Sequence, residues 1–81
     1  MFHFSVKEAL YLDGYKIWLK FHDGKQGVAD LSSCIIGEIF EPLKSISFFK
    51  TFVLERNTVA WKNGADFAPE FLYTVIKPRV Y

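Results

Sequence analysis

The feature that most constrains the fold is a seven-residue segment in which apolar and polar positions alternate. From Tyr15 to Phe21 every second residue is apolar, and Lys16, Trp18 and Lys20 occupy the positions between them. A period of two places alternate side chains on opposite faces of a β-strand. The segment therefore predicts a strand with one face toward a core and an outer face that carries Lys16, Trp18 and Lys20.

A turn signal directly before this strand predicts a β-hairpin. Asp13-Gly14 favours a two-residue turn, because glycine tolerates positive φ and aspartate hydrogen-bonds its own turn. Residues 2–12 would then form the partner strand, with Leu10 opposite Ile17.

That register has one cost, at Glu8. The carboxylate would lie on the apolar face, which is unfavourable unless it is paired. We therefore expect a β-bulge near Glu8-Ala9 that turns the carboxylate outward.

Further turn signals divide the rest of the chain into short elements. Residues 22–25 predict a turn into a strand at 27–31, which completes a three-stranded meander. Arg56-Asn57 predicts the turn of a second hairpin, because asparagine tolerates the left-handed conformation. Pro69 suits the first position of a closing helix.

Between the meander and the second hairpin, residues 32–50 lose the period of two. Ser32 or Ser33 is suited to cap a short helix, Pro42 prevents one long helix, and Ser45 is suited to cap a last turn. We expect one or two short helices that lay five apolar side chains on the sheet, namely Ile36, Ile39, Phe40, Leu43 and Phe49.

The element order β-β-β-α-β-β-α predicts an α+β fold of two layers. One layer is an antiparallel sheet made of the meander and the second hairpin, and short helices cover one of its faces. A chain of 81 residues, of which 51% are hydrophobic, has enough apolar surface for one core and too little length for two. We therefore expect a single domain over residues 1–81.

Charge and cysteine content narrow the functional classes. The chain has ten Lys and Arg residues and nine Asp and Glu residues, so it lacks the excess of positive charge that is typical of a general nucleic-acid binder. The N-terminus does not resemble a signal peptide, and no apolar run reaches the roughly 20 residues that span a bilayer. A single cysteine, Cys34, indicates a reducing compartment. We expect a soluble, cytoplasmic protein with no membrane contact.

Several residues along the chain carry a family resemblance, which covers roughly residues 6 to 73. The chain resembles the family called domain of unknown function 2442 (DUF2442) in the residues Leu19-x-Phe21-x-Asp23-Gly24, Asp30-Leu31, Leu43, Phe49 and Trp61-x-Asn63-Gly64-x-Asp66-x-x-Pro69-Glu70-x-Leu72-Tyr73. The resemblance implies a compact bacterial α+β domain without an established activity. Family members often occur with a second small protein, an arrangement similar to toxin–antitoxin systems.

The segment from Trp61 to Tyr73 allows two interpretations. In the first, Asn63 and Asp66 hydrogen-bond a ligand between Trp61 and Tyr73, which act as stacking walls. In the second, asparagine makes a turn, Asp66 satisfies nearby amides and the rings fill the core. Structural roles explain all four positions, so we favour the second interpretation.

No catalytic or metal-binding pattern is present in the sequence. Asp23, Asp30 and Asp66 do not have the spacing of a dense acidic loop for Mg²⁺ or Ca²⁺. His3 and His22 are too far apart in the sequence to indicate a zinc site with Cys34. We therefore predict no metal, no cofactor and no enzymatic activity.

The face with Lys16, Trp18 and Lys20 remains the best candidate for an interaction surface. An aromatic ring between two cations can contact a protein surface or seal a homodimer, and it can also stack a nucleic-acid base. The simplest alternative is a solvent-facing strand whose lysine stems cover the indole. We predict a non-enzymatic interaction module that binds a second copy or a small partner protein, with nucleic-acid binding as the alternative.

Overall fold

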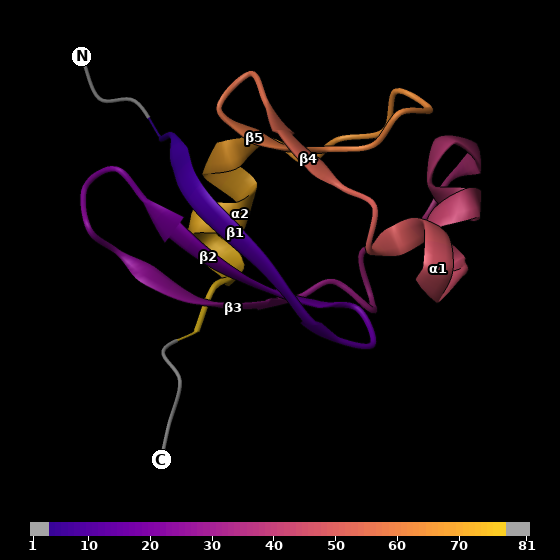
Figure 1. Cartoon of the computed structure of the whole chain (residues 1–81), viewed down its shortest axis with the longest axis horizontal. Helices are drawn as coiled ribbons and strands as arrows, with labels where there is room; N and C mark the ends of the chain where they lie inside the picture. The colour runs from indigo at the N-terminus through magenta and orange to yellow at the C-terminus, as the bar shows by residue number, and fades with distance from the viewer. Residues whose placement is uncertain (1–3, 78–81) are drawn as a thin grey trace.

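Two antiparallel β-sheets and three short helices make up residues 4–77, the part of the chain that the computed structural model describes (Figure 1). The elements follow the predicted order, so the α+β prediction is confirmed, but the second hairpin forms a sheet of its own instead of joining the meander in one sheet. The first sheet contains β1 (Val6–Asp13), β2 (Lys16–Phe21) and β3 (Gln26–Asp30), and the second contains β4 (Val53–Glu55) and β5 (Thr58–Ala60). The helices are the 3₁₀-helix η1 (Glu38–Lys44) and the α-helices α1 (Ile46–Phe49) and α2 (Pro69–Val75).

The first hairpin has a different register from the predicted one. Asp13 pairs with Lys16, so the two-residue turn is Gly14-Tyr15 instead of Asp13-Gly14. Leu10 lies opposite Trp18, and the predicted pairing of Leu10 with Ile17 is wrong.

Two register shifts in β1 explain this difference. One lies between Val6 and Glu8 and the other between Tyr11 and Asp13. The first shift keeps Val6 buried opposite Phe21 and turns Glu8 to the exposed face, opposite Lys20. An irregularity that turns Glu8 outward was expected, but it precedes Glu8, and Leu10 is therefore carried to the outer face as well.

The core lies between one face of the first sheet and the elements that cover it. In Figure 1, α2 lies across the three-stranded sheet, and the second hairpin and α1 lie beside it. Alternate residues of β2 point into this space, which accounts for the strict period of two in its sequence. The largest fully buried side chains are Phe21, Phe49, Ile17, Leu19, Leu31, Leu43, Leu72 and Val59.

The segment 32–50 folds only partly as expected. Two short helices form, with Pro42 inside η1 and Ser45 directly before α1. The first helix begins at Glu38, so capping by Ser32 or Ser33 is wrong, and Ile36 and Ile39 are 75% and 48% exposed instead of lying on the sheet.

The backbone before η1 explains the exposure of Ile36, whereas Ile39 lies within η1 and is exposed there. Residues 32–37 form turns and bends, and Gly37 has a φ of 104°. Residues 32–37 therefore have no helical period that could direct the Ile36 side chain inward. Leu43 and Phe49 are buried and Phe40 packs against the core, as predicted.

The second hairpin turns where the sequence predicted. Arg56 and Asn57 have φ values of 52° and 70°, the left-handed conformation that two-residue hairpin turns require. The amide of Val6 donates a hydrogen bond of 2.9 Å to the carbonyl oxygen of Asn57. This bond holds the tip of the second hairpin against the start of β1.

The chain after α2 returns to the first sheet. The helix begins at Pro69 as predicted, and Lys77 then pairs with Val28 through two backbone hydrogen bonds of 2.8 and 3.0 Å. The free edge of β3 is covered at this point. Within residues 4–77, no helix has the length and apolar character needed to cross a membrane.

Candidate functional site

Trp61 is a core residue that also contributes to the wall of a shallow pocket. Its side chain is 3% exposed, and its ring lies 5.6 Å from that of Phe49, 5.9 Å from Phe67 and 6.3 Å from Phe52, between ring centroids. The indole Nε1–H donates a 2.7 Å hydrogen bond to the carbonyl oxygen of Phe49. The indole therefore satisfies its own donor and one backbone acceptor while it fills the core.

Asn63 and Asp66 belong to the turn that follows β5. The Asn63 amide Nδ2 donates to the carbonyl oxygen of Ile39 at 2.9 Å, and Asn63 Oδ1 accepts from the amide of Ala65 at 3.2 Å. These bonds fix the turn and attach it to η1. Asp66 forms an isolated backbone bridge with Ala60, and its side chain is exposed.

Tyr73 connects α2 to the turn between β2 and β3. Its hydroxyl donates a 2.6 Å hydrogen bond to Asp23 Oδ2, and its ring packs edge-on against Phe21 with 4.9 Å between centroids. The Lys25 ammonium lies 4.1 Å from the centre of the tyrosine ring and donates to the Tyr73 carbonyl oxygen at 3.1 Å. Tyr73 and Trp61 therefore belong to separate aromatic groups and do not face each other across a ligand.

The Tyr73 hydroxyl lowers the pKa of Asp23 below its ordinary value of 3.8, and Asp23 raises the pKa of Tyr73 above 10.0. The lowered carboxyl pKa stabilises the fold above about pH 4, and this contribution is lost as the pH falls through the folded pKa of Asp23. The raised phenol pKa gives a contribution that is lost as the pH rises through the folded pKa of Tyr73.

Tyr73→Phe is therefore expected to be less stable than the parent between about pH 5 and pH 9, and the difference should vanish at strongly acidic pH. Urea unfolding of both proteins across this range measures it. A difference that persists unchanged at pH 2 would show that the hydroxyl contributes independently of the charge on the Asp23 carboxylate. Tyr11→Phe is the matched control, since its hydroxyl bonds only to the carbonyl of Gly14, a group that does not titrate.

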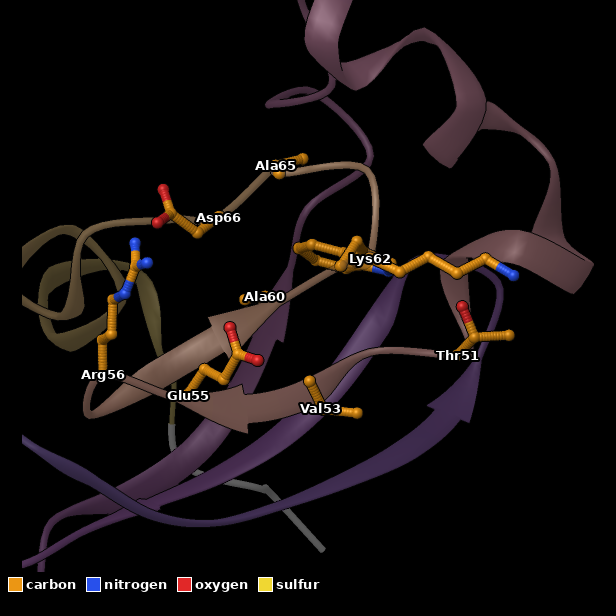
Figure 2. Close-up of a pocket in the computed structure, with 10 residues that line it drawn as sticks. Thr51, Val53, Glu55, Arg56, Ala60, Lys62, Ala65 and Asp66 are labelled. Carbon is orange, nitrogen blue, oxygen red and sulfur yellow. The ribbon is translucent and has the colours of Figure 1, made fainter.

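A shallow pocket of about 380 Å³ lies beside this segment. Figure 2 shows the Arg56 guanidinium and the Asp66 carboxylate close together at one end, with Glu55 pointing into the opening and Lys62 extending away toward Thr51. Two cations and two anions leave the pocket without a preferred ligand charge. Of the four candidate ligand residues in this segment, Trp61 and Asp66 line the pocket, and Asn63 and Tyr73 do not.

The outer face of the first sheet has a different character. Leu10, Trp18 and Val28 lie side by side on the three strands, because Trp18 pairs with Leu10 on one side and with Val28 on the other. Leu10 is 59% exposed, and Trp18 and Val28 are half-buried. We call these three residues the outer row.

Charged side chains border the outer row on both sides along the strands. Lys16 lies opposite Asp13 and Asp30, and Lys20 lies opposite Glu8 and Gln26. Each lysine therefore has an acidic neighbour across the sheet, and Lys16 contributes to the lowered pKa of Asp30, after the larger effect of hydrogen bonds from Ser32.

Leu10 and Val28 are members of this surface that the sequence reasoning did not find. The signal that could have found Leu10 is the conflict at Glu8, because a bulge placed before Glu8 moves Glu8 and Leu10 outward together. Val28 could have been found from the register between β2 and β3, which places it opposite Trp18.

The remaining candidate ligands are separated. Among residues 4–77, no three His, Cys, Asp or Glu side chains come close enough to hold one metal ion. Cys34 is half-buried in the wall of a second open pocket of about 640 Å³, beside Val28 and Lys77. His3 lies outside the described residues.

One family model matches the chain, over residues 6–78, and its description reads "Protein of unknown function (DUF2442)". No curated protein and no solved structure matches the chain.

Proposed function

The chain belongs to the DUF2442 family, whose description assigns no activity, and from its surface we propose that it is a non-enzymatic module that binds another protein through the outer face of its three-stranded sheet. The outer row of Leu10, Trp18 and Val28 is the observation that carries this proposal. An indole between two aliphatic side chains gives an apolar centre with a large contact area, and charged residues form its rim.

The charge of this face supports a protein surface as partner over nucleic acid. Lys16 and Lys20 are the two cations on β2, and each lies opposite a carboxylate of a neighbouring strand. A nucleic-acid surface needs an excess of cations that can replace counterions on phosphates. A mixed rim of both charges is typical of contacts between proteins.

The second open pocket extends the face beyond the sheet. Val28 and Asp30 belong both to the outer face and to the wall of this pocket, which continues to Thr74 and Lys77. A partner seated on the outer row would have a depression beside it that can receive a side chain. In a two-protein system this chain would be the antitoxin-like or accessory member.

Trp18→Ala tests the proposal, because it is expected to abolish binding while the fold remains. The parent and the variant carry the same affinity tag and are each incubated with extract of the native host. The mass of each captured complex is then measured. We expect the parent complex to contain one defined partner protein and the Trp18→Ala sample to lose it. Truncating a central interface tryptophan typically weakens binding by about 2 kcal/mol or more, or roughly thirtyfold.

Leu54→Ala is the matched control, since Leu54 is an exposed apolar residue on the second hairpin, away from the outer row. It should retain the partner. Equal capture by the parent and Trp18→Ala contradicts the proposal. Salt-sensitive binding of single- or double-stranded oligonucleotides that Trp18→Ala removes would identify nucleic acid as the ligand instead.

A further inference from the structure

β1 is an edge strand of the first sheet, and most of its outer edge has no backbone partner in the described part of the chain. The edge of β3 is covered where Val28 pairs with Lys77. On the edge of β1, Val6 is bonded to Asn57 at one end. Among residues 4–77, no further backbone hydrogen bond to this edge is found.

In an antiparallel sheet, successive residues of a strand hydrogen-bond alternately toward the strand on one side and the strand on the other. This alternation identifies which N–H and C=O groups of β1 lie on its outer edge. Phe21 N–H bonds to Lys25, and Leu31 N–H bonds to Tyr15, so the odd-numbered residues of β2 bond toward β3. The even-numbered residues of β2 therefore bond toward β1, and Trp18 is paired there with Leu10. It follows that the N–H and C=O groups of Ala9 and Tyr11 point away from the sheet.

We propose that a second copy of the chain pairs with this edge, with β1 antiparallel to β1 and a two-fold axis at Leu10. In this register Ala9 lies opposite Tyr11 of the other copy, and the outward N–H and C=O groups of both residues form reciprocal hydrogen bonds. A shift by one residue would place outward groups opposite residues that already bond within the sheet.

Charge complementarity selects this register over shifts by two residues. With the axis at Leu10, Lys7 near one end of β1 meets Asp13 near the other end of the partner strand, and the symmetry makes this pairing twice. Leu10 of one copy then lies beside Leu10 of the other copy. A shift in one direction places Glu8 opposite Leu10, and a shift in the other direction places Asp13 opposite Ala9, so both lose the opposite-charge pairs.

The two irregularities of β1 fit this pairing because they lie at its ends. Glu8 to Tyr11 pair regularly with β2 between the two register shifts. The inference rests on the proposed function, since pairing would join the two outer rows into one apolar stripe across both sheets. A second copy therefore enlarges the binding surface proposed above.

Charge reversal tests the pairing without disturbing the core, since Lys7 and Asp13 are both exposed. Sedimentation velocity over a range of concentrations measures the dimer dissociation constant of the parent, Lys7→Asp, Asp13→Lys and the double variant. We expect each single variant to weaken the dimer by about tenfold, because two like-charge pairs replace two attractive pairs. The double variant should return to within about threefold of the parent.

Amide hydrogen exchange on the same samples reports the strand itself. The amides of Ala9 and Tyr11 should become protected as protein concentration rises, while the amide of Val53 on the second hairpin should not change. A parent that remains monomeric at the highest concentration overturns the inference, as does a dimer insensitive to the charge reversals. Trp18→Ala should leave the dimer intact. The dimer proposal and the partner-binding proposal can therefore fail independently, the first by an absent dimer and the second by unchanged partner capture.

Discussion

Trp61→Ala is expected to lower the free energy of unfolding by about 3–5 kcal/mol. A domain of this size has a total free energy of unfolding of roughly 4–12 kcal/mol, so the variant should lose a large share of its stability. The indole is almost completely buried among Phe49, Phe52 and Phe67, so its removal leaves a cavity in the core.

Trp61→Phe separates the hydrogen bond from the packing. A phenyl ring retains much of the apolar contact but leaves the carbonyl oxygen of Phe49 without its donor. An unpaired buried acceptor costs about 1–3 kcal/mol, which adds to the smaller ring's loss of packing. Urea unfolding followed by circular dichroism gives both values, and an unchanged m-value would confirm that only stability has changed.

Trp18→Phe is the control for both substitutions, since Trp18 lies on the outer face and should change stability by less than about 1 kcal/mol. If Trp61→Ala retained the parent's stability and lost partner binding, Trp61 would be a functional residue, and the structural interpretation of the Trp61–Tyr73 segment would be wrong.

The second large effect is expected at Gly27. A β-carbon at this position would lie 2.5 Å from the carbonyl oxygen and 2.8 Å from the carbonyl carbon of Lys77. Backbone atoms cannot rotate away as a side chain does, so Gly27→Ala must push the returning chain off β3. We expect a loss of about 1–3 kcal/mol in the free energy of unfolding.

Hydrogen exchange locates this effect. In Gly27→Ala the amides of Val28 and Lys77, which bond to each other's carbonyl groups in the parent, should exchange faster, while the amide of Leu19 stays protected. Gln26→Ala, an exposed neighbour, should change neither quantity. Parent-like protection of both amides in Gly27→Ala would show that the returning chain can move without leaving the sheet.

Local signals in the sequence predicted the parts of the fold that depend on local chemistry. The period of two in β2, the left-handed turn at Arg56-Asn57 and the helix start at Pro69 are all confirmed. Each follows from the conformational preference of a few adjacent residues.

The sequence could not fix features that depend on distant contacts. The position of the irregularity in β1 depends on which residues bury best against the rest of the core, and it decides whether Leu10 faces inward or outward. The exposure of Ile36 follows from turns that precede η1.

The same limit applies to the candidate sites. The partner of Tyr73 is Asp23, which lies 50 residues away in the sequence. The turn of Asn63 and the buried indole of Trp61 were foreseeable as structural roles, whereas the outer row required the register of two strand pairs. Only the member on β2, Trp18, stood out from sequence alone.

The chain has two tryptophans: Trp61 is part of the core, and Trp18 is the residue that we propose binds a partner. Labelling both with 5-fluorotryptophan gives one ¹⁹F resonance for each indole. Adding native-host extract should shift the Trp18 resonance and protect it from a soluble paramagnetic quencher, while the Trp61 resonance should stay unchanged and inaccessible in buffer and extract alike. A Trp18 indole as accessible to the quencher in extract as in buffer would contradict the account.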